Sequence, residues 1–307
     1  MRARLSAAGL AGLLLTIVTT VQAARFESAV QPTFRTGIDL VTIGVTALDR
    51  KGNLITDLSA QDFEVLEDGK PQQIRYFSQG VDGAQTTTHL GLMLDTSGSM
   101  ENDLKLARSA AIKFLNLIPE AEDITLVDFD TEVRVTRYPQ RDFARLVERI
   151  RMRKPDGWTA LYDALGVYLH GADGRNGRTI LVMYTDGADS RSELNLGELM
   201  NLLKASQATV YAVGLIEHTG SLRNELRMRL QQMTEVTGGQ AFFPSALKDL
   251  DASYEKVLAE IRAQYQLGYL SSNTSLDGSW RKVEIKVRRP DVKLRSRKGY
   301  YAAFKEH

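Results

Sequence analysis

Residues 91–105 read GLMLDTSGSMENDLK, and this stretch decides the fold. An apolar run at 90–94 ends in Asp95, a loop of hydroxyl and glycine residues follows, and a helical pattern begins. Two further apolar runs, at 180–184 and 210–213, are each followed by a loop and a segment of helical period. Such runs indicate strands covered on both faces. Their alternation with helices predicts an α/β fold with a doubly wound, mostly parallel sheet flanked by helices.

The segments on both sides of this α/β region have residue patterns typical of β-strands. Between residues 38 and 78 short alternating runs are separated by turn residues, and the pair Asp68-Gly69 predicts a hairpin joining 63–65 to 74–77. At 282–288 apolar and charged residues alternate, as in a half-buried strand. Neither flank is long enough to bury a core alone. We therefore expect the α/β domain to be inserted between N- and C-terminal β segments that pack together as a small β-sandwich.

The first residues have the pattern of an export signal. Arg2 and Arg4 precede an apolar run at 10–21, and small residues at Val21 and Ala23 predict cleavage after Ala23. The run is shorter than the roughly 20 apolar residues of a membrane anchor. We expect an exported protein, periplasmic or secreted, with no transmembrane segment after cleavage. The predicted divisions are a signal peptide at 1–23, an N-terminal β segment and linker at 24–84, the α/β domain at 85–263 and a C-terminal β segment at 264–307.

Composition excludes several classes of function. The chain has 39 basic and 38 acidic residues, and two of the basic ones lie in the leader, so the mature balance of 37 to 38 argues against a dedicated nucleic-acid binder. The absence of cysteine excludes a disulfide and a lipid-modified cysteine. No serine, histidine and acid arrangement and no phosphate-binding glycine loop stands out, so we expect a protein that is not an enzyme.

Three loops after strands carry oxygen-rich side chains. Ligands of open α/β sheets bind outside the carboxyl ends of the strands, where these loops should meet. Carboxylates and hydroxyls without histidine or cysteine suit Mg²⁺ or Mn²⁺ and disfavour zinc. We therefore predict a metal site formed by Asp95, Ser97, Ser99, Thr159 and Asp186.

In their order along the chain, DTSGSM, the threonine of GWTAL and the aspartate of TDGAD resemble the metal-ion-dependent adhesion site of von Willebrand factor type A (VWA) domains. The resemblance covers roughly residues 88–262. The flanking stretches DFEVLEDGK, YQLGY and RKGYYA are additionally similar to a bacterial group of exported proteins that carry this domain.

The resemblance implies a role for each site residue. Ser97, Ser99 and Thr159 would contact the ion through their hydroxyls, and Asp95 and Asp186 would act directly or through water. One coordination position would stay open for an acidic residue of a protein partner, as in adhesion.

The chain departs from the family at residue 158, because family members commonly have two glycines before the threonine and here Gly157 is followed by Trp158. Trp158 either contacts the partner at the rim of the site or packs into the upper edge of the sheet.

Other interpretations of the polar loops remain open. The loop at 95–99 could be an ordinary helix cap. Asp128 and Asp130, two apart after an apolar strand, are similar to the nucleophile loop of haloacid-dehalogenase-type phosphatases and suggest a metal-dependent phosphohydrolase. A third possibility is a structural envelope protein with an empty site. Asp163 fits a first-turn carboxylate at a helix start, and Asp189 fits either a supporting role at the site or a plain turn.

Overall fold

The computed structural model describes residues 40–80, 87–116, 121–172, 175, 177–245 and 247–304. Of the predicted divisions, the signal peptide at 1–23 lies outside these residues. The described part of the chain belongs to one unit, which begins at Ile38. No helix in this part is long and apolar enough to cross a membrane.

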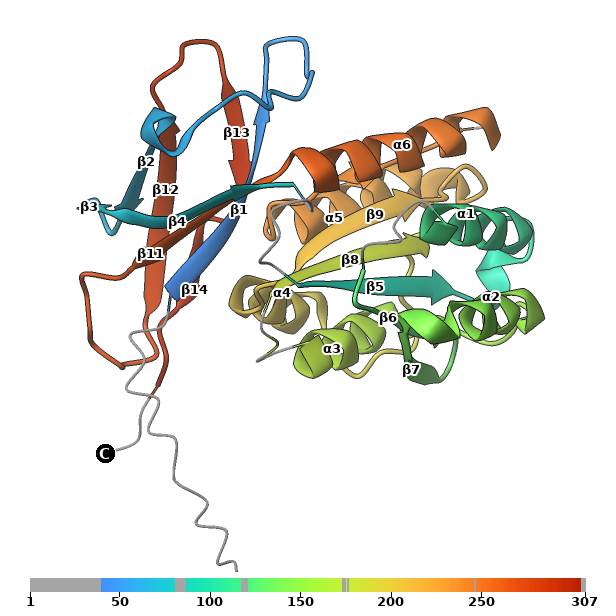
Figure 1. The fold of residues 1–307 in the computed structure, drawn as a ribbon. Helices are drawn as coiled ribbons and strands as arrows, with labels where there is room; N and C mark the ends of the chain where they lie inside the picture. Colours follow the sequence, from blue (N-terminus) through green and yellow to red (C-terminus); the bar gives the residue numbers. More distant parts are fainter. Residues whose placement is uncertain are drawn as a thin grey trace, which may run out of the picture. The chain divides into compact units, whose positions relative to one another are not determined.

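The apolar runs form the centre of a six-stranded sheet with strand order β10-β9-β8-β5-β6-β7 (Figure 1). Its strands are β5 (Thr88–Asp95), β6 (Asp123–Phe129), β7 (Val133–Pro139), β8 (Arg178–Thr185), β9 (Thr209–Gly214) and β10 (Ala241–Phe242). All pairs are parallel except β6 with β7, which is antiparallel at one edge. Every residue of β5, β8 and β9 is buried, as expected for strands covered on both faces.

Helices cover both faces of this sheet. They are α1 (Leu104–Asn116), α2 (Phe143–Met152), α3 (Leu161–Ala172), α4 (Leu196–Ala205), α5 (Arg223–Glu235) and α6 (Leu247–Ala263). One core cluster joins α1, α2 and α6 to alternate residues of the strands, such as Leu92 and Val182. The other joins α3, α4 and α5 to the residues between them, such as Met93 and Leu181. Alternate strand residues point to opposite faces, so the prediction of a doubly wound, mostly parallel sheet is confirmed.

The two flanking β segments interleave in two four-stranded sheets, β13-β1-β11-β4 and β14-β12-β2-β3. Their strands are β1 (Leu40–Leu48), β2 (Phe63–Glu67), β3 (Lys70–Gln72), β4 (Ile74–Gln79), β11 (Tyr265–Leu270), β12 (Trp280–Val287), β13 (Lys293–Ser296) and β14 (Gly299–Tyr301). Ile43 of β1 lies opposite Leu267 of β11, and Val65 of β2 lies opposite Ile285 of β12. Both sheets contribute to a shared apolar core. The predicted packing of the two segments is confirmed.

The hairpin prediction was correct in its turn but wrong in its second strand. Asp68 and Gly69 both have positive φ, of 47° and 79°, which fits a two-residue hairpin turn. The turn joins β2 to the short β3, whereas residues 74–79 form β4 and pair with β11 in the other sheet. Pro71 has no N–H to donate to a ladder, which suits β3 to a short edge strand.

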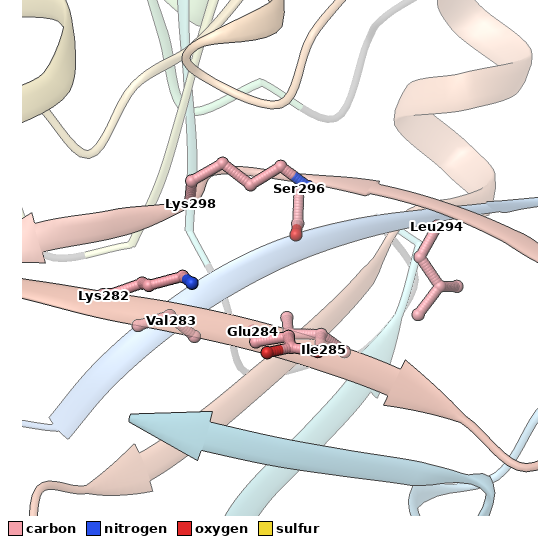
Figure 2. Close-up of a pocket in the computed structure, with 7 residues that line it drawn as sticks. All are labelled: Lys282, Val283, Glu284, Ile285, Leu294, Ser296 and Lys298. Carbon is pink, nitrogen blue, oxygen red and sulfur yellow. The ribbon is translucent and has the colours of Figure 1, made fainter. Parts of the chain in front are cut away.

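A cavity of about 360 Å³ opens within the sandwich beside β12 and β13 (Figure 2). Val283, Ile285 and Leu294 supply apolar walls, and Lys282 and Lys298 also line it. None of the predicted site residues lies there, so this cavity is separate from the loops described next.

Candidate metal centre at the carboxyl end of the central sheet

Asp95 and Asp186 leave the central sheet at the same edge. Asp95 is the last residue of β5, and Asp186 directly follows β8. The two strands are paired in parallel, with Leu94 opposite Tyr184. Parallel pairing places the carboxyl ends of adjacent strands side by side, so the two predicted carboxylates start from neighbouring positions.

The Asp95 carboxylate is fully buried and is held through both oxygens. Its Oδ1 accepts hydrogen bonds from the Ser97 hydroxyl at 2.5 Å and the Ser97 amide at 3.0 Å. Its Oδ2 accepts one from the Thr185 hydroxyl at 2.6 Å. The Ser97 and Ser99 hydroxyl oxygens lie 3.1 Å apart. Three of the five predicted residues are therefore linked: Ser97 contacts Asp95 directly, and Ser99 lies next to Ser97.

The loop that carries these serines is not extended throughout. Ser97 is extended, but a 3₁₀ helix begins at Gly98 and ends at Met100. Ser97 occupies the capping position of this helix and makes no side-chain capping hydrogen bond there. Its hydroxyl binds Asp95 instead, so the simple helix-cap interpretation does not describe Ser97.

The loop before α3 lies against the Ser97 loop. The amide of Asp156 donates to the carbonyl of Thr96 at 2.9 Å, and the amide of Gly98 donates to the carbonyl of Gly157 at 3.1 Å. Gly157 has a φ of +70°, and a β-carbon there would come within 2.4 Å of the Thr131 hydroxyl oxygen. Glycine is thus required at this position by backbone conformation and by space.

Thr159 connects this loop to the loop after β8. Its amide donates to the Ser190 hydroxyl at 3.1 Å, and its carbonyl accepts from the amides of Ser190 and Arg191 at 2.9 and 3.0 Å. Thr159 and Asp186 are both buried, and Asp186 accepts the amide of Ala188 at 2.8 Å. Backbone hydrogen bonds therefore join all three loops predicted to form the site.

The two carboxylates influence each other electrostatically. Burial, followed by the negative charge of Asp186, raises the pKa of Asp95 to about 7 against the opposing hydrogen bonds from Ser97 and Thr185. Within the described part of the chain, no cationic side chain is among the causes of this shift. The donor set is two carboxylates and three hydroxyls, which fits a hard divalent cation. Among the described residues no three His, Asp or Glu side chains gather to hold a metal, so hydroxyl ligands would be essential here.

The sequence analysis missed Asp103, which lies just before α1. Burial raises the pKa of Asp103, His218 opposes the shift at 3.7 Å, and Asp186 adds to it. Asp103 and His218 therefore lie close to the Asp186 loop. The only signal in the sequence was an acid four residues after Ser99, which is equally common at the start of any helix.

Asp163 and Asp189 support the loop after β8. The Asp163 carboxylate accepts the amides of Glu193 and Leu194 at 2.9 and 3.0 Å. Asp189 accepts the amide of Tyr162 at 3.1 Å and the Ser192 hydroxyl at 2.6 Å. These exchanged hydrogen bonds tie the first turn of α3 to the chain that follows Asp186.

Asp128 and Asp130 are bound by arginines. Asp128 is buried and forms ion pairs with Arg134 at 2.8 Å and with Arg153, and Arg149 lies 3.6 Å from it. Asp130 also pairs with Arg134. A carboxylate held by guanidinium groups is a weak nucleophile, so this arrangement does not favour the phosphohydrolase alternative.

Trp158 is 67% exposed, so the alternative in which it packs into the edge of the sheet is wrong. Its amide donates to the Thr131 hydroxyl at 2.9 Å, which fixes its backbone beside Gly157. The indole is therefore presented to solvent one residue before Thr159.

Residues 90–188 match the family model of the von Willebrand factor type A domain, and this stretch contains all five predicted metal ligands. The match supports the predicted VWA domain. No curated protein is similar enough to the chain to count as a match.

The chain is similar to several solved structures at low identity. The D319A mutant of the PilB minor pilin from Streptococcus sanguinis is 15% identical, with a TM-score of 0.46, over 58% of this chain and 62% of the pilin. A von Willebrand factor type A protein from Catenulispora acidiphila is 12% identical, with a TM-score of 0.47, over 76% of this chain and 75% of that one. The pilus adhesin SpaC from Lactobacillus rhamnosus GG in its open conformation is 9% identical, with a TM-score of 0.48, over 79% of this chain and 47% of the adhesin. The chain thus spans less than two thirds of the pilin and less than half of the adhesin.

Proposed function

We propose that this chain is an exported adhesion module whose VWA domain binds a protein partner through Mg²⁺ or Mn²⁺. It would act in recognition rather than turnover, in the periplasm or after secretion. The similarity of its flanking stretches to the bacterial exported group, and the pairing of those flanks in one sandwich, support this placement.

The observation that carries the proposal is a buried pair of carboxylates that no cationic side chain of the described residues balances. Three other buried acids have such partners: Asp123 pairs with Arg137, Asp128 with Arg134 and Glu260 with Arg295. Asp95 receives only hydroxyl and amide donors and is next to a second acid. Buried charge is costly without an opposite charge, and a divalent cation would supply it.

Glu67, in the sandwich, is a useful contrast. It is buried and accepts hydrogen bonds from the hydroxyls of Tyr269, Ser271 and Tyr300. Three donors solvate this single carboxylate, and hydroxyl solvation alone can stabilise one buried acid. Two acids at one site repel each other as well, which is the feature that favours a cation at Asp95 and Asp186.

The hydrogen bonds support a division of roles among the proposed ligands. The Ser97 hydroxyl donates its proton to Asp95, so its lone pairs are free to face a cation. Ser99, whose hydroxyl lies beside that of Ser97, and Thr159 would add further hydroxyl ligands. Both oxygens of Asp95 already accept hydrogen bonds, which suits contact with the ion through water; Asp186 would act directly or through water.

The neutral ligands explain why the partner should offer an acid. Where the two acids contact the ion through water, its direct protein ligands are three neutral hydroxyls, and a partner carboxylate would complete its coordination. Trp158, exposed one residue from Thr159, would add apolar contact around that carboxylate.

The proposal is tested in two stages. Mn²⁺ binding is first counted by electron paramagnetic resonance for wild type, Ser99→Ala and Ser109→Ala; Ser109 is an exposed serine of α1 whose hydroxyl donates to its own helix. We expect one site in wild type and Ser109→Ala and weaker binding in Ser99→Ala. Proteins from the native envelope are then captured with and without a chelator. A partner that Ser99→Ala and chelator-treated protein retain in full would rule out recognition through the ion.

A further inference from the structure

A small polar pocket lies at the opposite end of the central sheet from the candidate metal centre. It has a volume of about 30 Å³. Arg178 and Thr179 at the start of β8 and Thr209 at the start of β9 line it, together with Gln266 of β11 and Arg297, which follows β13. Strands rise about 3.3 Å per residue, so the eight residues of β8 separate Arg178 from Asp186 by roughly 26 Å.

Two arginines of this pocket are buried, with 6% exposure for Arg178 and 7% for Arg297. Arg178 donates to the carbonyl of Ile261 at 2.8 Å and to the side-chain oxygen of Gln264 at 2.7 Å. Arg297 donates to the carbonyls of Gly299 and Lys204, both at 2.9 Å. All four acceptors are neutral.

No carboxylate balances these two charges within the described residues. The ion pairs of the described chain include neither Arg178 nor Arg297, although the neighbouring Arg295 pairs with Glu260. The Nε of Arg178 is buried and has no hydrogen-bond partner. The pocket is therefore lined by two cationic side chains that no described carboxylate balances.

Both guanidinium groups remain charged at neutral pH. Burial lowers the pKa of each to about 10, which is still well above 7. A buried cation without an opposite charge is strongly disfavoured. An anion in the pocket would offset this cost.

The other residues that line the pocket, and its small volume, limit the class of ligand that it can bind. Threonine hydroxyls and glutamine amides also line the pocket and can donate hydrogen bonds to an anion. A volume of 30 Å³ exceeds the about 10–15 Å³ that one water requires, but it is far below the several hundred Å³ of sites for drug-sized ligands. One small ion fits these limits and a nucleotide or peptide does not.

We propose that Arg178 and Arg297 form a binding site for one small inorganic anion, which links the start of the central sheet to the sandwich. Arg178 belongs to the α/β domain and Arg297 to the chain between β13 and β14, so the ion would contact both parts. This site is independent of the proposed metal centre, because it shares no residue with it.

The test measures chemical unfolding of the full chain against increasing chloride, sulfate or phosphate, with ionic strength held constant by gluconate, which is too large for the pocket. We expect saturable stabilisation by at least one of the three anions. At a concentration of 100 times Kd, the ratio of folded to unfolded protein should rise about 100-fold. General salt effects are not saturable in this way, which separates them from site binding.

Two variants locate the effect. Arg297→Gln should raise Kd by roughly 10-fold or more, because it removes charge-assisted hydrogen bonds. Arg281→Gln is the matched control, since Arg281 is equally buried but pairs with Asp277 at 3.0 Å, and it should keep the wild-type Kd. If Arg297→Gln does not fold, Arg297→Lys replaces it and should also raise Kd. The proposal fails if wild type shows no saturable response to any of the three anions, or if the Arg297 variant keeps the wild-type Kd.

Discussion

The two ends of the central sheet bury opposite charges. Among the described residues, Asp95 and Asp186 at the carboxyl end have no cationic partner, and Arg178 and Arg297, which line one pocket at the amino end, have no acidic partner. Parallel strands cause this separation, because every strand start lies at one edge and every strand end at the other. Helix N-termini also collect at the carboxyl edge, where their positive ends favour acidic side chains such as those of the site. The carboxyl end therefore favours a cationic ligand, and the amino end favours an anionic one.

Asp128 lies between these extremes, because it is buried at the carboxyl end but paired with arginines. Asp128→Asn should lower the free energy of unfolding by about 3 kcal/mol, since it leaves partly buried guanidinium groups without their anion. Urea unfolding measures this loss. Asp291→Asn, which removes an exposed partner of Arg50, should cost less than about 1 kcal/mol. Equal losses in the two variants would contradict the comparison.

A cation should stabilise the carboxyl end only while its acids are intact. Mg²⁺ at 100 times its Kd should raise the free energy of unfolding of wild type by about 2.7 kcal/mol through mass action. Asp95→Ala should lose this increment, which calorimetry with and without Mg²⁺ would measure. An equal Mg²⁺ effect in both proteins would mean that the site is misassigned.

Thr185 is expected to position Asp95 through its 2.6 Å hydrogen bond. Thr185→Val should lower the free energy of unfolding by about 1–2 kcal/mol, because it removes a donor to a buried carboxylate. It should also weaken Mg²⁺ binding. Thr185→Ser, which retains the hydroxyl, serves as the control in a Mg²⁺ titration, and its affinity should stay nearer to wild type.

Trp158→Ala should have the smallest effect on folding, within about 0.5 kcal/mol, because most of the side chain is in solvent. Mg²⁺ affinity should be unchanged. Partner binding, once a partner is captured, should weaken by about 2 kcal/mol, as expected for an interface tryptophan. Binding equal to wild type would remove Trp158 from the proposed contact surface.

Local patterns were sufficient to predict the architecture and the meeting of the three candidate loops at one edge of the sheet. Buried runs such as residues 180–184 indicated strands covered on both faces, and their loops had to meet at one edge of the sheet. The turn at Asp68-Gly69 was also predictable, because a positive φ at two consecutive positions restricts the residue types that can occupy them. The pairing of residues 74–79 was not predictable in this way, because they form β4 and pair with β11, nearly two hundred residues further along the chain.

By itself, then, the sequence determined the periodicities, the turns and the residue types at the strand ends, since these depend on neighbours a few positions apart. Only the tertiary structure decided which charges are balanced. The exposure of Trp158, the proximity of Asp103 to Asp186 and the pocket shared by Arg178 and Arg297 have no local signal. They arise because burial and pairing depend on which distant segments pack together, and a charged residue has the same local pattern whether or not a partner reaches it.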